Sequence, residues 1–198
     1  MKHAAFLPSP RALLWAPLCA AAMLLAAGAA HADDYADVNT LLRSGKPAEA
    51  LTKADAYIQG NPRDPQMRFL RGVILSEQGK QADAQAAFTQ LTQDYPELPE
   101  PYNNLAAIYA AQGQYDKARD ALESAVRANP HYATAHENLG DVYVRLAAQH
   151  YAKAQGYAST SASAEAKLAL VRQLFEQNTN TGALPAPSGA APKTIHNR

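Results

Sequence analysis

Residues 102–130 read YNNLAAIYAAQGQYDKARDALESAVRANP, and three residue types in this stretch recur along the chain at a fixed distance. Counterparts of its glycine at 113, its alanine at 118 and its proline at 130 occur 34 and 68 residues earlier. The three columns are Gly45, Gly79 and Gly113; Ala50, Ala84 and Ala118; and Pro62, Pro96 and Pro130. A constant period of this length is typical of stacked helical hairpins.

Each column has a physical reason. A glycine can adopt the left-handed conformation that closes a helix, so each glycine predicts a tight turn between two antiparallel helices. The small alanine five residues later lets the paired helices approach closely. Proline cannot continue a helix, so it predicts the end of the second helix of each pair. Asp64-Pro65 then predicts a capped start of the next pair, and Pro99 repeats that start.

The pattern resembles the tetratricopeptide repeat, whose consensus has an aromatic residue, Leu-Gly, Tyr, Ala, Phe, Ala and Pro at set offsets. The third unit carries most of the resemblance, through Tyr102, Leu105, Ala106, Tyr109, Gly113, Ala118, Leu122, Ala125 and Pro130. The second unit departs from it, with Arg68 in the aromatic position and Arg71 in the leucine position. The resemblance implies an all-α fold, a right-handed superhelical solenoid of antiparallel helix pairs that usually holds other proteins.

Four hairpins are expected, at about residues 33–64, 65–98, 99–132 and 133–158. The fourth hairpin drifts from the pattern. Tyr151-Ala-Lys-Ala154 resembles Tyr115-Asp-Lys-Ala118, but it is displaced from the 34-residue period and no glycine marks its turn.

The segments on either side of the array differ from it in composition. Residues 1–32 combine Lys2 and Arg11, an apolar run and an Ala30-His31-Ala32 ending, which predicts a signal peptide cleaved after Ala32. An uncleaved membrane anchor is the alternative, because residues 12–30 carry no charge. A lipidated Cys19 is disfavoured, because Ala16-Pro17-Leu18 lacks the small residue expected directly before such a cysteine.

A second amphipathic segment follows the array. Leu168, Val171, Leu174 and Phe175 fall on one helical face, so residues 161–178 predict a helix that caps the last repeat. Residues 179–198 consist mainly of Asn, Thr, Pro, Ala, Gly and Ser, which predicts a flexible tail.

Composition narrows the function. Lys and Arg number 18 and Asp and Glu number 18, and this balance argues against a nucleic-acid partner. The single cysteine lies in the expected leader, so neither a disulfide framework nor thiol chemistry is expected. No histidine pair has metal-ligand spacing and no nucleophile has an identifiable base. We therefore expect no enzyme activity, no cofactor and no metal.

The expected functional surface is the concave side of the array, which the first helices of the units line. Consensus positions between the packing residues give this groove as Tyr35, Asn39, Arg43, Phe69, Val73, Ser76, Asn103, Ala107, Ala110, Glu137, Asp141 and Arg145. A shift of one residue in the phase would instead place Phe69 and Val73 in the core. Asparagine amides suit an extended peptide, because each offers both donors and acceptors to a backbone.

Chaperone-binding members of the family grip a peptide carboxylate with lysines, an arginine and asparagines. Here Tyr35 and Glu100 stand where that clamp needs lysine, Leu70 stands where it needs asparagine, and Asn39 alone fits. The sequence therefore predicts a periplasmic scaffold or adaptor that binds one or more cell-envelope proteins through an extended segment. Self-association as a structural module is the rival interpretation, and a membrane-anchored accessory subunit follows if the leader is retained.

Overall fold

The computed structural model describes residues 34–157 and 162–178, with side chains up to residue 174, and every regular element in these ranges is a helix. The all-α prediction is therefore confirmed. The expected leader, residues 1–32, and the expected tail, residues 179–198, lie outside the described residues. The chain divides into two compact units, one up to Lys53 and one from Ala54 onward, and each is described by itself.

In the first unit, residues 34–43 are helical and a turn at Gly45 leads into α2, Pro47–Gly60, which continues into the second unit. Gly45 has φ of +69°. Val38 and Ala50 are fully buried. On the surface of this unit, Lys53 forms an ion pair with Asp37.

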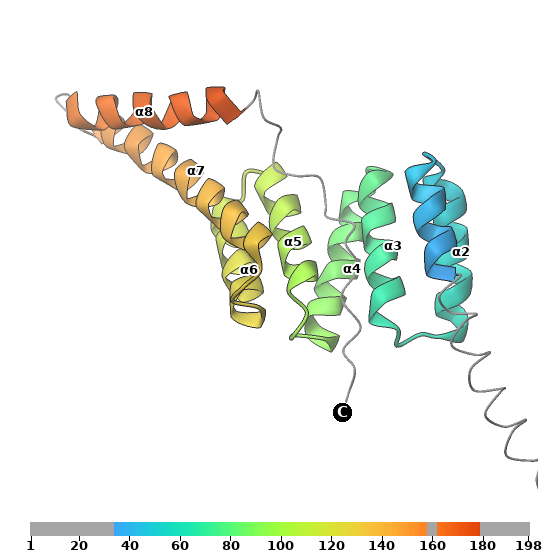
Figure 1. The fold of residues 1–198 in the computed structure, drawn as a ribbon. Coiled ribbons are helices and arrows are strands. Elements are labelled where there is room, and N and C mark those ends of the chain that lie inside the picture. Colours follow the sequence, from blue (N-terminus) through green and yellow to red (C-terminus); the bar gives the residue numbers. More distant parts are fainter. Residues whose placement is uncertain (1–33, 158–161, 179–198) are drawn as a thin grey trace, which may run out of the picture. The chain divides into compact units, whose positions relative to one another are not determined.

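The second unit is a series of helix pairs (Figure 1). Its helices are α3, Pro65–Glu77; α4, Gln81–Asp94; α5, Pro99–Ala111; α6, Tyr115–Ala128; α7, Ala133–Tyr157; and α8, Ala162–Asn178. Successive helices run antiparallel, so α3 with α4 and α5 with α6 form the second and third predicted hairpins.

Two glycine turns make these hairpins. Gly79 and Gly113 both have φ of +72°, a conformation that a side chain would strain. The N–H of Gly79 donates to the Ser76 carbonyl at 2.9 Å and that of Lys80 to the Leu75 carbonyl at 2.9 Å. The turn at Gly113 repeats both bonds, so the otherwise unpaired carbonyls at each helix end are satisfied.

The start of α3 also follows the prediction. Asp64 precedes the helix with extended backbone, and its Oδ1 accepts a hydrogen bond from the Met67 N–H at 2.9 Å. Pro65 occupies the first helical position, where its missing N–H costs nothing.

The core of the second unit is built from small and branched side chains. Ala84 and Ala118, two members of the alanine column, are fully buried, as predicted for close helix packing. One continuous cluster joins three helices: Ala106 and Ala110 of α5, Ala118, Leu122 and Ala125 of α6, and Ala135, Val142 and Leu146 of α7.

The prediction of a complete hairpin within residues 133–158 is wrong. Helix α7 runs without interruption from Ala133 to Tyr157, 25 residues, where a turn near residue 147 was expected. The physical reason lies in the sequence, because residues 141–155 contain neither glycine nor proline to close the helix.

Helix α8 takes the place of the missing second helix. It runs antiparallel to α7 and packs on it through Ala164 and Leu168, which are 7% and 4% exposed. Leu174 of the predicted apolar stripe is instead 51% exposed, and Leu170 is 62% exposed. The helix is therefore the partner of α7 in a long last hairpin and leaves part of its own apolar surface uncovered.

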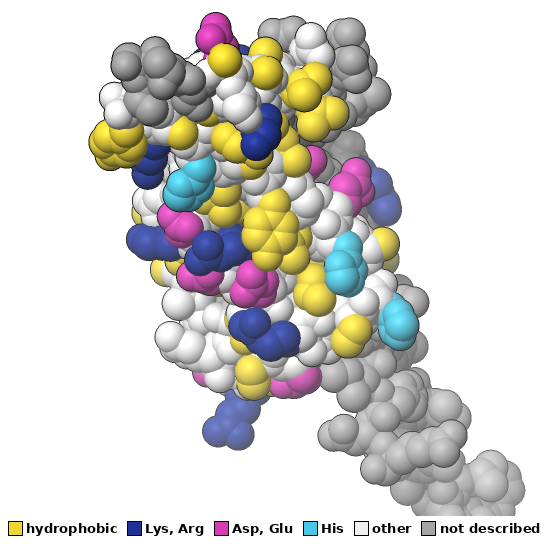
Figure 2. All heavy atoms as spheres, turned by 90° about the vertical axis from the view of Figure 1, so that its left-hand side faces the viewer, with side chains coloured by type: hydrophobic (Ala, Val, Ile, Leu, Met, Phe, Trp, Pro, Cys, Tyr) yellow, Lys and Arg dark blue, Asp and Glu magenta, His cyan; other side chains and the backbone are white. Residues whose placement is uncertain are grey.

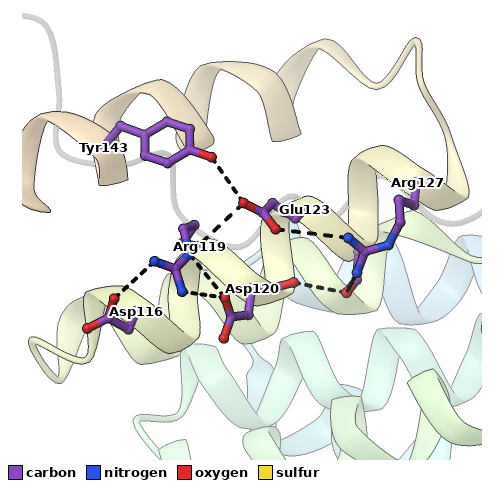
Figure 3. A network of polar contacts seen from close by, with 7 residues as sticks. Asp116, Arg119, Asp120, Glu123, Arg127 and Tyr143 are labelled. Carbon is purple, nitrogen blue, oxygen red and sulfur yellow. Dashed lines mark hydrogen bonds and ion pairs between the residues drawn. The ribbon is translucent and has the colours of Figure 1, made fainter.

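An ionic network covers the outer surface of α6 (Figure 3). Arg119 lies 3.1 Å from Asp116 and 2.7 Å from Asp120, and Glu123 accepts a hydrogen bond from the Tyr143 hydroxyl of α7 at 3.0 Å. These side chains are largely exposed, so each pair contributes only about 0–1 kcal/mol. The network links α6 to α7 at the surface, whereas the buried cluster provides most of the packing.

Gly72 and Gly140, which occupy the same position two repeats apart, provide a test of this packing. An alanine at 72 would place its methyl group 2.6 Å from Cε1 of the fully buried Phe88, whereas nothing lies within 4 Å of a methyl group at 140. We expect Gly72→Ala to destabilise the chain by about 1–3 kcal/mol. Gly140→Ala should stabilise it by up to about 1 kcal/mol through helix propensity. Urea unfolding measures both, and shifts of the same sign would contradict the described packing.

Candidate functional site

The twelve predicted groove residues lie on the first helix of each repeat, but they differ in exposure. In the first unit, Tyr35 and Asn39 are half-buried and Arg43 is exposed. The Asn39 side chain donates to the Tyr35 carbonyl at 2.8 Å. One of its amide hydrogens is therefore already used within its own helix.

Two of the predicted groove residues belong to the core. Phe69 is fully buried and Val73 is 1% exposed, so the assignment of both to a partner-binding surface is wrong. The Phe69 and Phe88 rings lie 5.7 Å apart, centroid to centroid. Phe88 reaches this position because Gly72 has no side chain to obstruct it. Ser76, further along α3, is half-buried.

The strongest candidate site is a group of amides shared by α5 and α7. Nδ2 of Asn138 donates to Oδ1 of Asn103 at 2.8 Å, and the two residues are 5% and 3% exposed. Asn104, 1% exposed, donates through Nδ2 to the Glu100 carbonyl at 2.9 Å. We call Glu100, Asn103, Asn104 and Asn138 the amide site.

The amide site has unused acceptors. Oδ1 of Asn104, Oδ1 of Asn138 and Oε2 of Glu100 are buried and have no hydrogen-bond partner. Leaving a buried acceptor without a partner costs about 1–3 kcal/mol, more for a charged one. Three such oxygens in one neighbourhood indicate a place where a ligand with donor groups would gain binding energy.

A small pocket adjoins the site. Its volume is about 10 Å³, close to the minimum that holds one water molecule. Its lining consists of Ala106, Ala107, Ala110, Leu122, Asn138 and Val142. The predicted groove residues Ala107 and Ala110 thus line this pocket, next to the Asn138 amide.

The electrostatics of the site are negative. Burial raises the pKa of Glu100 above its ordinary value of 4.5, and a hydrogen bond from its own backbone opposes the shift. Burial also raises the pKa of Tyr132 to about 12, and the Glu100 charge adds to this shift. Glu100 and Tyr132 therefore lie near enough to interact, at the start of α5.

The remaining predicted residues lie on α7. Glu137 is exposed and Asp141 is half-buried, and both lie within one helical turn of Asn138. The Arg145 guanidinium lies 5.7 Å from the centre of the Tyr115 ring, so it packs against α6. The predicted acidic end of the groove is therefore adjacent to the amide site.

Sequence reasoning selected Asn103 but missed Asn104, Asn138 and Glu100 as members of one site. A signal was present, because Asn104 and Asn138 are 34 residues apart and thus occupy the same repeat position. Repetition alone does not show, however, that their oxygens lack partners.

Two other kinds of site are not found in residues 34–157 and 162–178. No group of three or more His, Cys, Asp or Glu side chains there could hold a metal ion. None of the helices in those ranges is long and apolar enough to cross a bilayer. Figure 2 shows cationic and anionic side chains interspersed on the face that it presents.

Comparison with sequence families agrees with the repeat pattern. Residues 35–99 and 87–120 each match a family described as tetratricopeptide repeat, and residues 108–146 match one described as TPR repeat. The TPR repeat-containing thioredoxin TTL4 of Arabidopsis thaliana is 32% identical over 106 residues. The match covers 54% of this chain and only 15% of that protein.

Solved structures share the fold at low identity. A thermophilic TPR protein from Thermus thermophilus has a TM-score of 0.55 at 21% identity, over 74% of this chain and 84% of that one. The first TPR of Spaghetti (RPAP3), bound to an HSP90 peptide, has a TM-score of 0.52 at 19% identity, over 56% and 88%. Naa15/Naa10 bound to HypK-THB has a TM-score of 0.51 at 17% identity, over 75% and 23%.

The raised pKa of Glu100 gives a test by pH. The folded chain binds this proton more tightly than the unfolded chain, so its stabilising effect is present below pH 4.5 and is lost as pH rises above it. Glu100→Gln should therefore raise Tm relative to wild type at pH 7 and bring a smaller gain at pH 4. Thermal melts across this range measure the difference. Glu97→Gln, at an exposed position, is the control, and a gain for Glu100→Gln that does not grow with pH would contradict the assignment.

Proposed function

Because residues 35–146 carry tetratricopeptide repeats, we propose that this chain is a non-enzymatic adaptor that holds an extended segment of a partner protein against α5 and α7. Tetratricopeptide repeats generally mediate protein–protein interaction. The observation that carries the proposal is the amide site, whose buried Asn104 and Asn138 oxygens have no partner within the chain.

An extended peptide fits this chemistry. Its backbone presents N–H groups at regular intervals, and each can donate to an asparagine oxygen. Because Asn104 and Asn138 occupy equivalent positions in successive repeats, they can contact successive parts of one segment. The pocket beside Asn138 gives room for a small group of the bound segment.

The partner differs in chemistry from the HSP90 peptide bound to the RPAP3 domain. In this chain Leu70, at a position where a carboxylate clamp needs asparagine, is fully buried. Glu100, at a position where the clamp needs lysine, is an acid. A peptide carboxylate would meet an anion instead of a cation at this end of the amide site.

We place this adaptor in the bacterial periplasm, in the service of a cell-envelope complex. The support is in the sequence: a basic start, an apolar run and the Ala30-His31-Ala32 ending of residues 1–32. Loss of this leader would remove the single cysteine, leaving a chain that depends on helix packing and not on disulfides.

Self-association is the second candidate function, and a surface feature favours it. Tyr157, Leu170 and Leu174 are 88%, 62% and 51% exposed on the last hairpin. Apolar side chains left uncovered at the end of a repeat array are suited to stacking on a second copy.

The leader gives the first prediction. The exported protein should begin at Asp33, directly after the small residues at positions 30 and 32. Mass spectrometry of the protein from a periplasmic extract identifies this terminus. A chain that begins at Met1 would overturn the cleavage and support a membrane-anchored accessory subunit.

The adaptor proposal is tested by capture from periplasmic extract. Asn103→Ala combined with Asn138→Ala removes the amide pair and should reduce capture of the partner about fivefold or more, as for a central binding contact. Gln85→Ala and Lys117→Ala, on the second helices α4 and α6, are the controls and should capture normally. Circular dichroism and Tm verify that all variants are folded.

The two candidate functions give different outcomes in this assay. If the control variants lose capture and the amide variant does not, the amide site is not where the partner binds. Unchanged capture by every variant, with self-association reduced by Leu170→Ser and Leu174→Ser, would favour the structural module.

A further inference from the structure

We propose that the amide site selects a cationic side chain, lysine or arginine, on the extended segment that it binds. This inference rests on the proposed adaptor function and specifies the chemistry of the partner. The observation behind it is that all three unpartnered buried atoms of the site, in Glu100, Asn104 and Asn138, are acceptors.

The amides are oriented to accept. Nδ2 of Asn104 donates to the Glu100 carbonyl at 2.9 Å, and Nδ2 of Asn138 donates to Asn103 at 2.8 Å. With their nitrogens held inside the protein, both side chains present oxygen to a ligand. An ammonium group carries three donors and a guanidinium five, and neither carries an acceptor that would remain unpaired.

The charges around the site have the matching sign. Glu100 is the only charged residue of α5, and Glu137 and Asp141 flank Asn138 on α7. The nearest cations are engaged elsewhere, because Arg145 packs over Tyr115 and Arg68 forms an ion pair with Asp94 at 2.6 Å. A cation would therefore enter a region of negative potential with no competing positive group of α5.

The site favours an organic cation over a bare metal ion. A divalent cation with oxygen ligands takes six or more of them, several usually carboxylates. The amide site has one carboxylate, and the described residues contain no group of three or more potential ligands. A side chain on a peptide brings its own backbone N–H groups to the remaining amide oxygen.

A positional peptide array tests the proposal with the exported chain. The probes are nonapeptides with mixed flanking residues and Lys, Arg, Gln or Glu fixed at the centre. Wild-type protein should bind the Lys and Arg sets about tenfold better than the Gln set, the value of one charge-assisted hydrogen bond, and the Glu set least. Equal binding of the four sets would overturn the inference while leaving peptide binding itself intact.

Glu100 is tested by charge reversal. Glu100→Gln should reduce the preference for Lys over Gln to near unity, and Glu100→Lys should invert it in favour of Glu peptides. Glu97→Lys makes the same change in net charge at an exposed position three residues away and should keep the wild-type preference. If Glu97→Lys inverts the preference as fully as Glu100→Lys, the effect is long-range steering and the proposed contact is absent.

Asn104 provides a variant that separates binding from folding. Asn104→Leu removes a buried acceptor that has no partner, so Tm should stay level or rise while binding of the Lys set falls. A loss of both Tm and binding would mean that the amide is structural and would count against the inference.

The cations of the chain itself are the remaining alternative. Lys193 and Arg198 lie in residues 179–198, which contain no acidic residue. The Lys193→Ala, Arg198→Ala double variant should bind the Lys set as wild type does. A large gain in binding by that variant would show that the C-terminal segment competes for the site, which would overturn the assignment to a separate partner.

Discussion

The left-handed glycine turn is the constraint on which the rest of the structure depends. Gly45, Gly79 and Gly113 are the described residues with positive φ, and they are 34 residues apart. Each turn reverses the chain after the same number of residues, so equivalent positions of successive repeats occupy equivalent places. The constraint shows equally where it is missing, because α7 continues for 25 residues without such a glycine and α8 serves as its antiparallel partner.

The amide site is a consequence of that register. Asn104 and Asn138 are equivalent residues of adjacent repeats, and Asn103 reaches across to Asn138 at 2.8 Å. Apolar packing on the other side of these helices buries the amides without providing donors for all of their oxygens. A repeat that packs well can thus hold unsatisfied polar atoms at a fixed place, where a ligand recovers the cost of their burial.

The sequence predicted the turns, the alanine contacts and the start of α3, because each depends on residues close in the chain. Exposure was harder to predict. The repeat phase placed Phe69 on the groove, yet Gly72 admits the Phe88 ring and both aromatic residues are buried. For the amide site, the 34-residue spacing identified equivalent asparagines but could not show which atoms lack partners. The leader and the cellular location rest on residues 1–32 and stay predictions.

The central claim is that the Asn104 and Asn138 oxygens face the bound segment. Carboxamide NMR signals of asparagine-labelled chain, recorded while a lysine-centred nonapeptide is added, test it most directly. The account predicts that the Asn104 and Asn138 signals shift together as the site fills, because both oxygens gain donors. The signal of Asn129, at the end of α6, should stay in place. Peptide binding that shifts other signals and leaves those of Asn104 and Asn138 unchanged would contradict it.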